Sequence, residues 1–209
     1  MEDKQITEQE SFLIIQQMIQ TAKKEQKDDG KAWIIWGWTL FAASVLTYFN
    51  MVNDWFNTFF FWNLFGGFAI GAFLYTAARV YFFRKSERVR TYTSDLLGKL
   101  NVGFFLTLML IIVAINVGAR TSYVSMTPSK GFSLMVGLYA FWVLIYGTAL
   151  NFRPSVIASY IMWGIAFVCL FVEDFRYIML LHSLAVLVGY IIPGHMANRA
   201  FKKVNRAIL

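Results

Sequence analysis

Six apolar stretches, separated by short polar segments, account for most of the chain after residue 31. They run over residues 32–49, 55–83, 101–118, 132–150, 154–172 and 177–192. An α-helix needs roughly 20 apolar residues to cross the hydrocarbon layer of a membrane. The pattern therefore predicts an all-α polytopic membrane protein with six transmembrane helices.

The first 31 residues are polar but carry a helical pattern. Thr7 and Glu10 have the spacing of a capping box, and apolar residues recur at helical intervals from Phe12 to Ala22. The segment lacks the apolar core of a cleavable signal peptide, so we expect the first apolar stretch to direct insertion. The predicted organisation is an amphipathic cytoplasmic helix (1–31), a transmembrane bundle (32–193) and a basic cytoplasmic tail (194–209).

Positive charge predicts the orientation of the bundle. Segments on alternate sides of the six stretches carry sixteen Lys and Arg residues on one side and three on the other. Because cytoplasmic loops are enriched in Lys and Arg, both termini are predicted to be cytoplasmic, in a bacterial inner membrane. Basic residues at this side are expected to contact anionic lipid head groups: Arg79, Arg84, Lys85, Arg88, Arg90, Arg199, Lys202 and Lys203.

Composition supports a lipid environment. Hydrophobic residues make up 58% of the chain and the mean hydropathy is +0.53, which is too apolar for an ordinary soluble domain. The net charge of +7 lies beside apolar spans, so it indicates contact with lipid head groups and argues against nucleic acid as a partner. A single cysteine excludes a disulfide within the chain.

Several local signals predict how the helices end and pack. Gly67 and Gly71 have the spacing that lets a neighbouring helix approach closely. Pro154 follows Asn151 in a tight turn and suits the first turn of the next helix. We expect residues 50–54 to form a turn, Pro193 to end the last helix, and Trp33 to lie in the head-group zone with its neighbouring tryptophans.

His182 is the one ionisable residue predicted to lie well inside the membrane. Cys169 and Glu173, on the preceding helix and turn, could share its depth and form a small polar cluster. The simpler interpretation is a neutral histidine hydrogen-bonded to a backbone carbonyl or a polar side chain of a neighbouring helix. Two histidines and one cysteine make a metal site improbable on chemical grounds, and no catalytic residues or cofactor can be named.

Short motifs spread over the chain resemble those of small, uncharacterised multi-pass bacterial inner-membrane proteins. They are the N-terminal Glu8–Ser11 and Ile15–Ile19 segments, the Asn151–Pro154 turn and the closing Tyr190–His195 segment, together with the tryptophan-rich start of the first span. The resemblance implies a six-helix membrane protein and no particular activity.

Three classes of function remain open from the sequence. The favoured hypothesis is a non-enzymatic regulatory, sensory or scaffolding protein that engages anionic lipid, a second copy or a cytoplasmic protein through its cytoplasmic face. A small permease or channel is the first alternative, and it requires a water-accessible path between the helices. An intramembrane enzyme or cofactor-binding protein built around His182 is the second.

Overall fold

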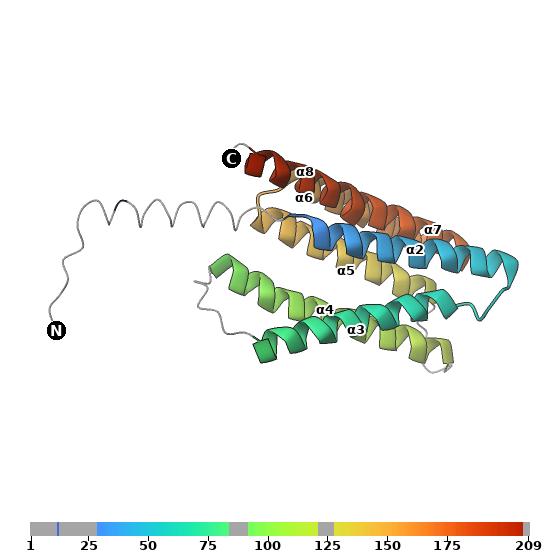
Figure 1. Ribbon diagram of the computed structural model, residues 1–209. Coiled ribbons are helices and arrows are strands. Elements are labelled where there is room, and N and C mark those ends of the chain that lie inside the picture. Colours follow the sequence, from blue (N-terminus) through green and yellow to red (C-terminus); the bar gives the residue numbers. More distant parts are fainter. Residues whose placement is uncertain (1–11, 13–28, 84–91, 121–127, 207–209) are drawn as a thin grey trace.

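The computed structural model describes residue 12 and residues 29–83, 92–120 and 128–206. The described chain is all-α and forms six antiparallel helical rods (Figure 1). They are α2 (Lys31–Asn53), α3 (Phe60–Phe83), α4 (Tyr92–Arg120), α5 (Pro128–Ala149), α6 (Arg153–Phe171), and a last rod that continues from α7 (Phe175–Val186) through η1 (Leu187–Ile191) into α8 (Ile192–Arg206). The predicted N-terminal amphipathic helix, apart from Phe12, lies outside the described residues, as does the basic run from Arg84 to Arg90.

Five of these helices are long and apolar enough to cross a membrane, as judged by length and composition. They are Lys31–Asn53, Leu96–Asn116, Pro128–Ala149, Arg153–Phe171 and Phe175–Lys203. Helix α3 contributes a shorter apolar segment, Phe60–Ala72. The chain is therefore a multi-pass membrane protein in contact with the lipid bilayer, with five candidate spans.

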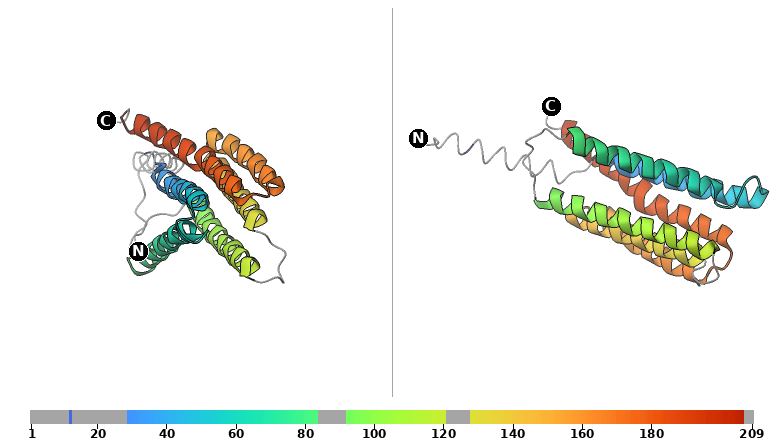
Figure 2. Two further views of the ribbon diagram at one scale, coloured as in Figure 1. Left: turned by 90° about the vertical axis from the view of Figure 1, so that its right-hand side faces the viewer. Right: turned by 90° about the horizontal axis from the view of Figure 1, so that it is seen from below.

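The rods pack unevenly. Helices α5 and α6 form a closely packed hairpin, and α2 lies along α7 and η1. Helix α4 packs on α5, whereas α3 makes its extensive contacts with α2. Seen from below, α3 and α4 flank the last rod, which is visible between them (Figure 2, right). Helices α3 and α4 are thus the two peripheral members of the bundle, each with one extensively contacted neighbour among the described helices.

The turn after α2 is organised by the side chain of Asn50. We predicted a turn over residues 50–54, but the helix continues to Asn53, so this boundary was wrong. Asn50 is fully buried, its Nδ2 donates to the carbonyls of Phe56 and Asn57, and its Oδ1 accepts from the Phe56 N–H. One amide side chain therefore replaces the backbone partners that the returning chain lacks.

The turn between α5 and α6 follows the sequence prediction. Asn151 adopts a left-handed backbone conformation with φ of 50°, which asparagine tolerates better than most residues. Helix α6 begins at Arg153 with Pro154 in its first turn. Proline suits this position because the first N–H groups of a helix have no intrahelical partner.

The last rod does not end at Pro193, and that prediction was wrong. A π-helical turn, η1, precedes Pro193, and the Ile192 N–H donates to the Leu187 carbonyl five residues back. A proline inside a regular α-helix clashes with the carbonyl four residues before it, and the π-turn shifts those carbonyls. The helix therefore continues through Pro193 to Arg206.

Trp33 is buried in the core of the bundle and does not face lipid. Its side chain is buried between two tyrosines, with ring centroids 4.8 Å from Tyr146 and 4.9 Å from Tyr190. Trp38, five residues on, is exposed on the surface of α2. The sequence predicted the same depth, the head-group zone, for Trp33 and Trp38. The helix face on which each indole lies decides which of them meets lipid.

We predict that Gly147→Ala disrupts the α5–α6 hairpin. A Cβ at this position would lie 2.8 Å from the Ser155 Cβ and 3.0 Å from the Val156 backbone nitrogen. Overpacking of this kind costs about 1–3 kcal/mol, so the free energy of unfolding in detergent should fall by that amount.

The matched control is Gly164→Ala in α6, where an added Cβ meets nothing within 4 Å. It should leave the free energy of unfolding unchanged or raise it slightly, because glycine is a poor helix former. Equal effects of the two changes would contradict a backbone approach specific to Gly147.

Candidate functional site

Exposed positive charge gathers at one end of the bundle, which we call the basic end. This end carries the start of α2, the α5–α6 turn and the last turns of α8 (Figure 1). Its exposed cations in the described residues include Arg153, Arg199, Lys202 and Lys203. The opposite end carries Asp54, Lys130, Glu173, Asp174 and Arg176, so the described chain is electrostatically asymmetric.

A cavity of about 280 Å³ opens at the basic end. We call it the basic-end cavity. Its lining includes Trp33 from α2, Tyr146 from α5, Phe152 from the turn, and Ala197, Ala200 and Phe201 from α8. Helix α8 is strongly amphipathic and presents this face of small and aromatic residues to the cavity. The walls suit an apolar chain or ring whose polar part stays at the surface.

Cations flank the basic-end cavity. Arg153 follows the lining residue Phe152, and Lys203 lies three residues, one helical turn, beyond the lining residue Ala200. Both are exposed. An apolar cavity with basic residues at its rim is the arrangement expected for an anionic amphiphile.

A second cavity lies among the helices, and we call it the intramembrane cavity. Three of its sides come from α2, α3 and α4, and it is lined mainly by apolar and aromatic side chains, Trp36, Phe65, Phe104 and Phe105 among them. Tyr139 from α5 and Tyr190 from η1 form its floor. Trp33, which lines the basic-end cavity, packs in a tilted contact against Tyr190, which lines the intramembrane cavity.

His182 is fully buried behind the intramembrane cavity. Its Nδ1 lies 2.7 Å from the Ser44 hydroxyl oxygen on α2. Aromatic rings surround the imidazole, with centroids at 5.1 Å for Trp62, 5.9 Å for Phe132 and 5.7 Å for Tyr139. The partner is thus a polar side chain of a neighbouring helix, of the type that the simpler interpretation of His182 expects.

The hydrogen bonds of Ser44 assign the His182 tautomer. The Ser44 hydroxyl donates its single hydrogen to the Leu40 carbonyl at 2.8 Å, so it accepts from the His182 Nδ1–H. Nε2 then carries the lone pair, and it is buried without a hydrogen-bond partner in the described part of the chain. The neutral ring is held in place through one nitrogen.

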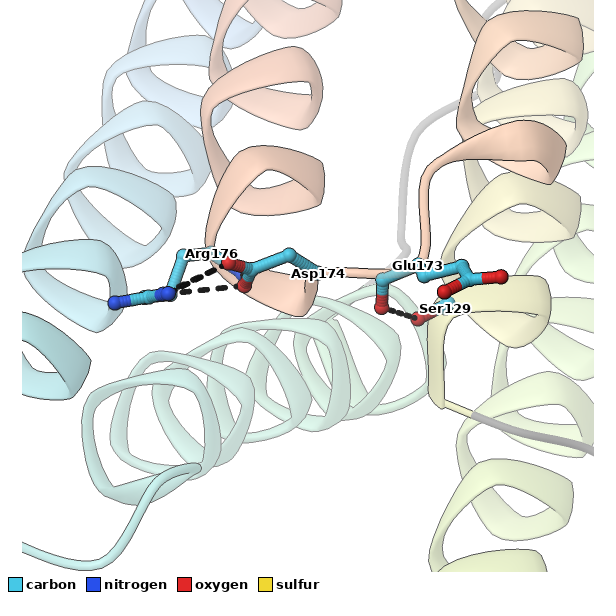
Figure 3. Close-up of polar contacts among 4 residues, drawn as sticks. All are labelled: Ser129, Glu173, Asp174 and Arg176. Atoms are coloured by element: carbon cyan, nitrogen blue, oxygen red, sulfur yellow. Dashed lines mark hydrogen bonds and ion pairs between the residues drawn. The ribbon is translucent and has the colours of Figure 1, made fainter.

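Cys169 shares the burial of His182, whereas Glu173 does not. Cys169 is completely buried in the core, and Glu173 is exposed at the α6–α7 turn. The Glu173 backbone carbonyl accepts a 3.4 Å hydrogen bond from the Ser129 hydroxyl, while its carboxylate points away from Asp174 (Figure 3). The polar cluster of Cys169, Glu173 and His182 stays a prediction.

Gly67 and Gly71, predicted from the sequence to pack against a helix, line neither cavity. An added Cβ at Gly67 or Gly71 meets nothing within 4 Å, so these glycines face away from the described helices, and their packing role stays a prediction. The side chain of Arg79 is not described. Among the described residues, no group of three His, Cys, Asp or Glu side chains could hold a metal ion.

Comparison with known proteins gives no family for this chain: no family model, no curated protein and no solved structure matches it. The chain is a multi-helix protein with five candidate membrane-spanning helices among its described residues, and no family is identified for it.

We predict that Ser44→Ala destabilises the bundle by isolating His182. The imidazole would remain buried with no partner for either nitrogen, which costs about 1–3 kcal/mol of unfolding free energy. A double change with His182→Phe should cost less than the sum of the two single changes, because no polar group is then stranded.

The control is Ser183→Ala. The Ser183 hydroxyl donates to the Leu180 carbonyl of its own helix, so this change strands no group on another helix. Chemical unfolding in detergent gives the free energy of unfolding of the three single variants and the double variant. Additive effects of Ser44→Ala and His182→Phe would contradict the coupling.

A further prediction concerns Asp174, which caps α7. Its carboxylate accepts from the Arg176 side chain and backbone N–H, with the closest contact 2.7 Å (Figure 3). The Arg176 side-chain hydrogen bonds, then the backbone bond, lower the pKa of Asp174 below its usual value. A lowered folded pKa stabilises the fold at neutral pH, and that contribution is lost as pH falls through the folded pKa.

Asp174→Asn should therefore lower the melting temperature slightly at neutral pH, and the difference should vanish well below about pH 4, where the native carboxyl is protonated. Glu173→Gln is the control, because the recorded contact of Glu173 is through its backbone. Melting curves across this pH range would contradict the cap if the gap stayed constant.

Proposed function

We propose that the chain is a non-enzymatic protein of a bacterial inner membrane that binds anionic lipid at its basic end. In this proposal α3 is the sixth membrane crossing and both termini are cytoplasmic. The excess of Lys and Arg on one side of the spans supports this orientation. The 1–31, 32–193 and 194–209 divisions then correspond to cytoplasmic helix, bundle and tail, although α8 carries the last rod on into the tail.

The observation that carries the proposal is the basic-end cavity. It combines a volume of about 280 Å³, aromatic walls and flanking cations. An acyl chain would lie against Trp33 and Phe201, and a phosphate would be reached by Lys203 or Arg153 at the rim. Arg199 and Lys202, exposed on the same helix, add to the positive surface at head-group depth.

A binding role fits the interior better than a transport role. A path from the basic-end cavity to the intramembrane cavity would have to separate Trp33 from Tyr190, and Trp33 is also packed against Tyr146. The start of α2 is also held in place, since the Asn198 side chain donates to the Asp29 carbonyl at 2.6 Å. The described start of α2 therefore lies beside the basic-end cavity, where bound lipid could regulate contact with a second copy or a cytoplasmic protein.

Native mass spectrometry of the full chain, extracted gently from its own membrane, tests the proposal. We expect retained phospholipid enriched in anionic species such as phosphatidylglycerol. Lys203→Gln and Ala200→Phe should each reduce this retained lipid several-fold, the first by removing charge at the rim and the second by filling the cavity.

Lys130→Gln is the matched control, because Lys130 is an exposed lysine at the opposite end. It should leave the retained lipid unchanged. A chain lacking residues 1–28 reports in the same spectra whether the N-terminal segment holds a second copy or a protein partner; this truncation keeps Asp29 and its bond to Asn198. Zwitterionic lipid alone, or equal loss in Lys130→Gln and Lys203→Gln, would overturn the proposal.

A further inference from the structure

Two tyrosines, one from α5 and one from η1, line the intramembrane cavity. Tyr139 and Tyr190 are each 2% exposed and line the cavity with rings 5.9 Å apart. Among the described residues neither phenol hydroxyl has a hydrogen-bond partner, and neither is fully enclosed in the way that His182 Nε2 is. An unpaired hydroxyl in an apolar environment is costly, so these two donors favour a ligand that brings an acceptor.

The depth of this floor limits which acceptor can reach it. Tyr139 lies 11 residues after Pro128 and 10 before Ala149, the two ends of α5. At 1.5 Å per residue, it is on the order of 15 Å from either end, near the middle of the membrane. Phospholipid ester groups lie at the edge of the hydrocarbon layer, and the acyl chains that reach its middle carry no acceptor. The ligand must be a molecule that dissolves in hydrocarbon and carries its own carbonyl.

The walls and the mouth indicate the shape of such a ligand. Trp36, Phe65 and Phe104 supply aromatic surfaces that suit a flat ring. Helices α3 and α4 both line the cavity and share no extensive contact with each other, so a ligand tail between them would displace few contacts. Its volume is about 50 Å³, which admits the leading edge of a ring while the remainder lies in the mouth.

We infer that the intramembrane cavity binds a membrane-dissolved quinone, with one ring carbonyl accepting hydrogen bonds from Tyr139 and Tyr190. The ring lies among the aromatic walls, and its apolar tail leaves between α3 and α4. The interaction is binding alone, and the quinone keeps its redox state. This site is distinct from the basic-end cavity, with which it shares no lining residue.

The test is a titration of the full chain in phosphatidylcholine nanodiscs with a decyl-substituted dimethoxy-methyl-benzoquinone. Quinones quench tryptophan fluorescence, and Trp36 and Trp62 line the cavity, so binding appears as saturable quenching above the linear background from dissolved probe. Tyr139→Phe and Tyr190→Phe should each weaken this saturable binding about fivefold, as expected for one lost hydrogen bond. Tyr160→Phe is the control, since that phenol is 64% exposed on α6.

A second pair of variants tests the site without altering a hydroxyl. Gly66 lines the cavity and Gly67 does not, and an added Cβ at either meets nothing within 4 Å. Gly66→Leu should abolish saturable quenching, whereas Gly67→Leu should keep it. Each variant is compared with the parent chain in melting temperature and elution volume, to show that it is folded. If a tyrosine variant is not folded, the comparison of Gly66→Leu with Gly67→Leu decides the outcome.

Two results would overturn the inference. The first is the absence of saturable quenching in the parent chain, as expected if the cavity holds water or lipid chains alone. The second is equal competition by decylbenzene, which has the ring and tail but no carbonyl, because the cavity would then be an apolar groove without carbonyl recognition.

Discussion

Small residues let α2 and the last rod approach each other closely, and the rest of the bundle is arranged around this seam. A Cβ at Gly37 would lie 2.8 Å from the Ile191 side chain, and one at Gly30 would collide with the Gly194 carbonyl oxygen. In lipid, apolar side chains gain little by leaving their solvent, so helices associate through close van der Waals contact and interhelical hydrogen bonds. The bond between Ser44 and His182 lies on the same seam and adds the polar part of this attraction.

Hydropathy predicted the membrane class and the order of the helices, because lipid imposes one composition on every span. Local rules also placed the turn at Asn151 and Pro154 correctly. They failed at Pro193, where a proline usually ends a helix, because the preceding π-turn depends on packing. A Cβ at Gly189 within that turn would collide with the Met162 side chain of α6. This contact joins two distant segments, so it cannot be predicted from the sequence around Pro193.

The candidate site was harder to predict than the fold. His182 was visible as an ionisable residue in an apolar span, but its partner Ser44 lies 138 residues earlier in the chain. Nothing in the sequence marked Tyr139 and Tyr190 as a pair among the ten tyrosines. An apolar helix in lipid has no strong polar face to mark its inner side, so sequence periodicity could not show that these two phenols share one cavity. The meeting of α2, α5 and η1 had to be seen in the structure.

Uneven packing explains why the intramembrane cavity lies where it does. Helices α5 and α6 are held by a close hairpin and by the hydrogen bond from the Ser133 hydroxyl to the Ala166 carbonyl. Helix α3 has its extensive contacts with α2, and its glycines at 66 and 67 meet no neighbour. Elements with few contacts are the least costly to displace. Trp62, the α3 residue that covers His182, therefore belongs to the least restrained wall, while the tyrosine floor belongs to the most firmly packed part of the bundle.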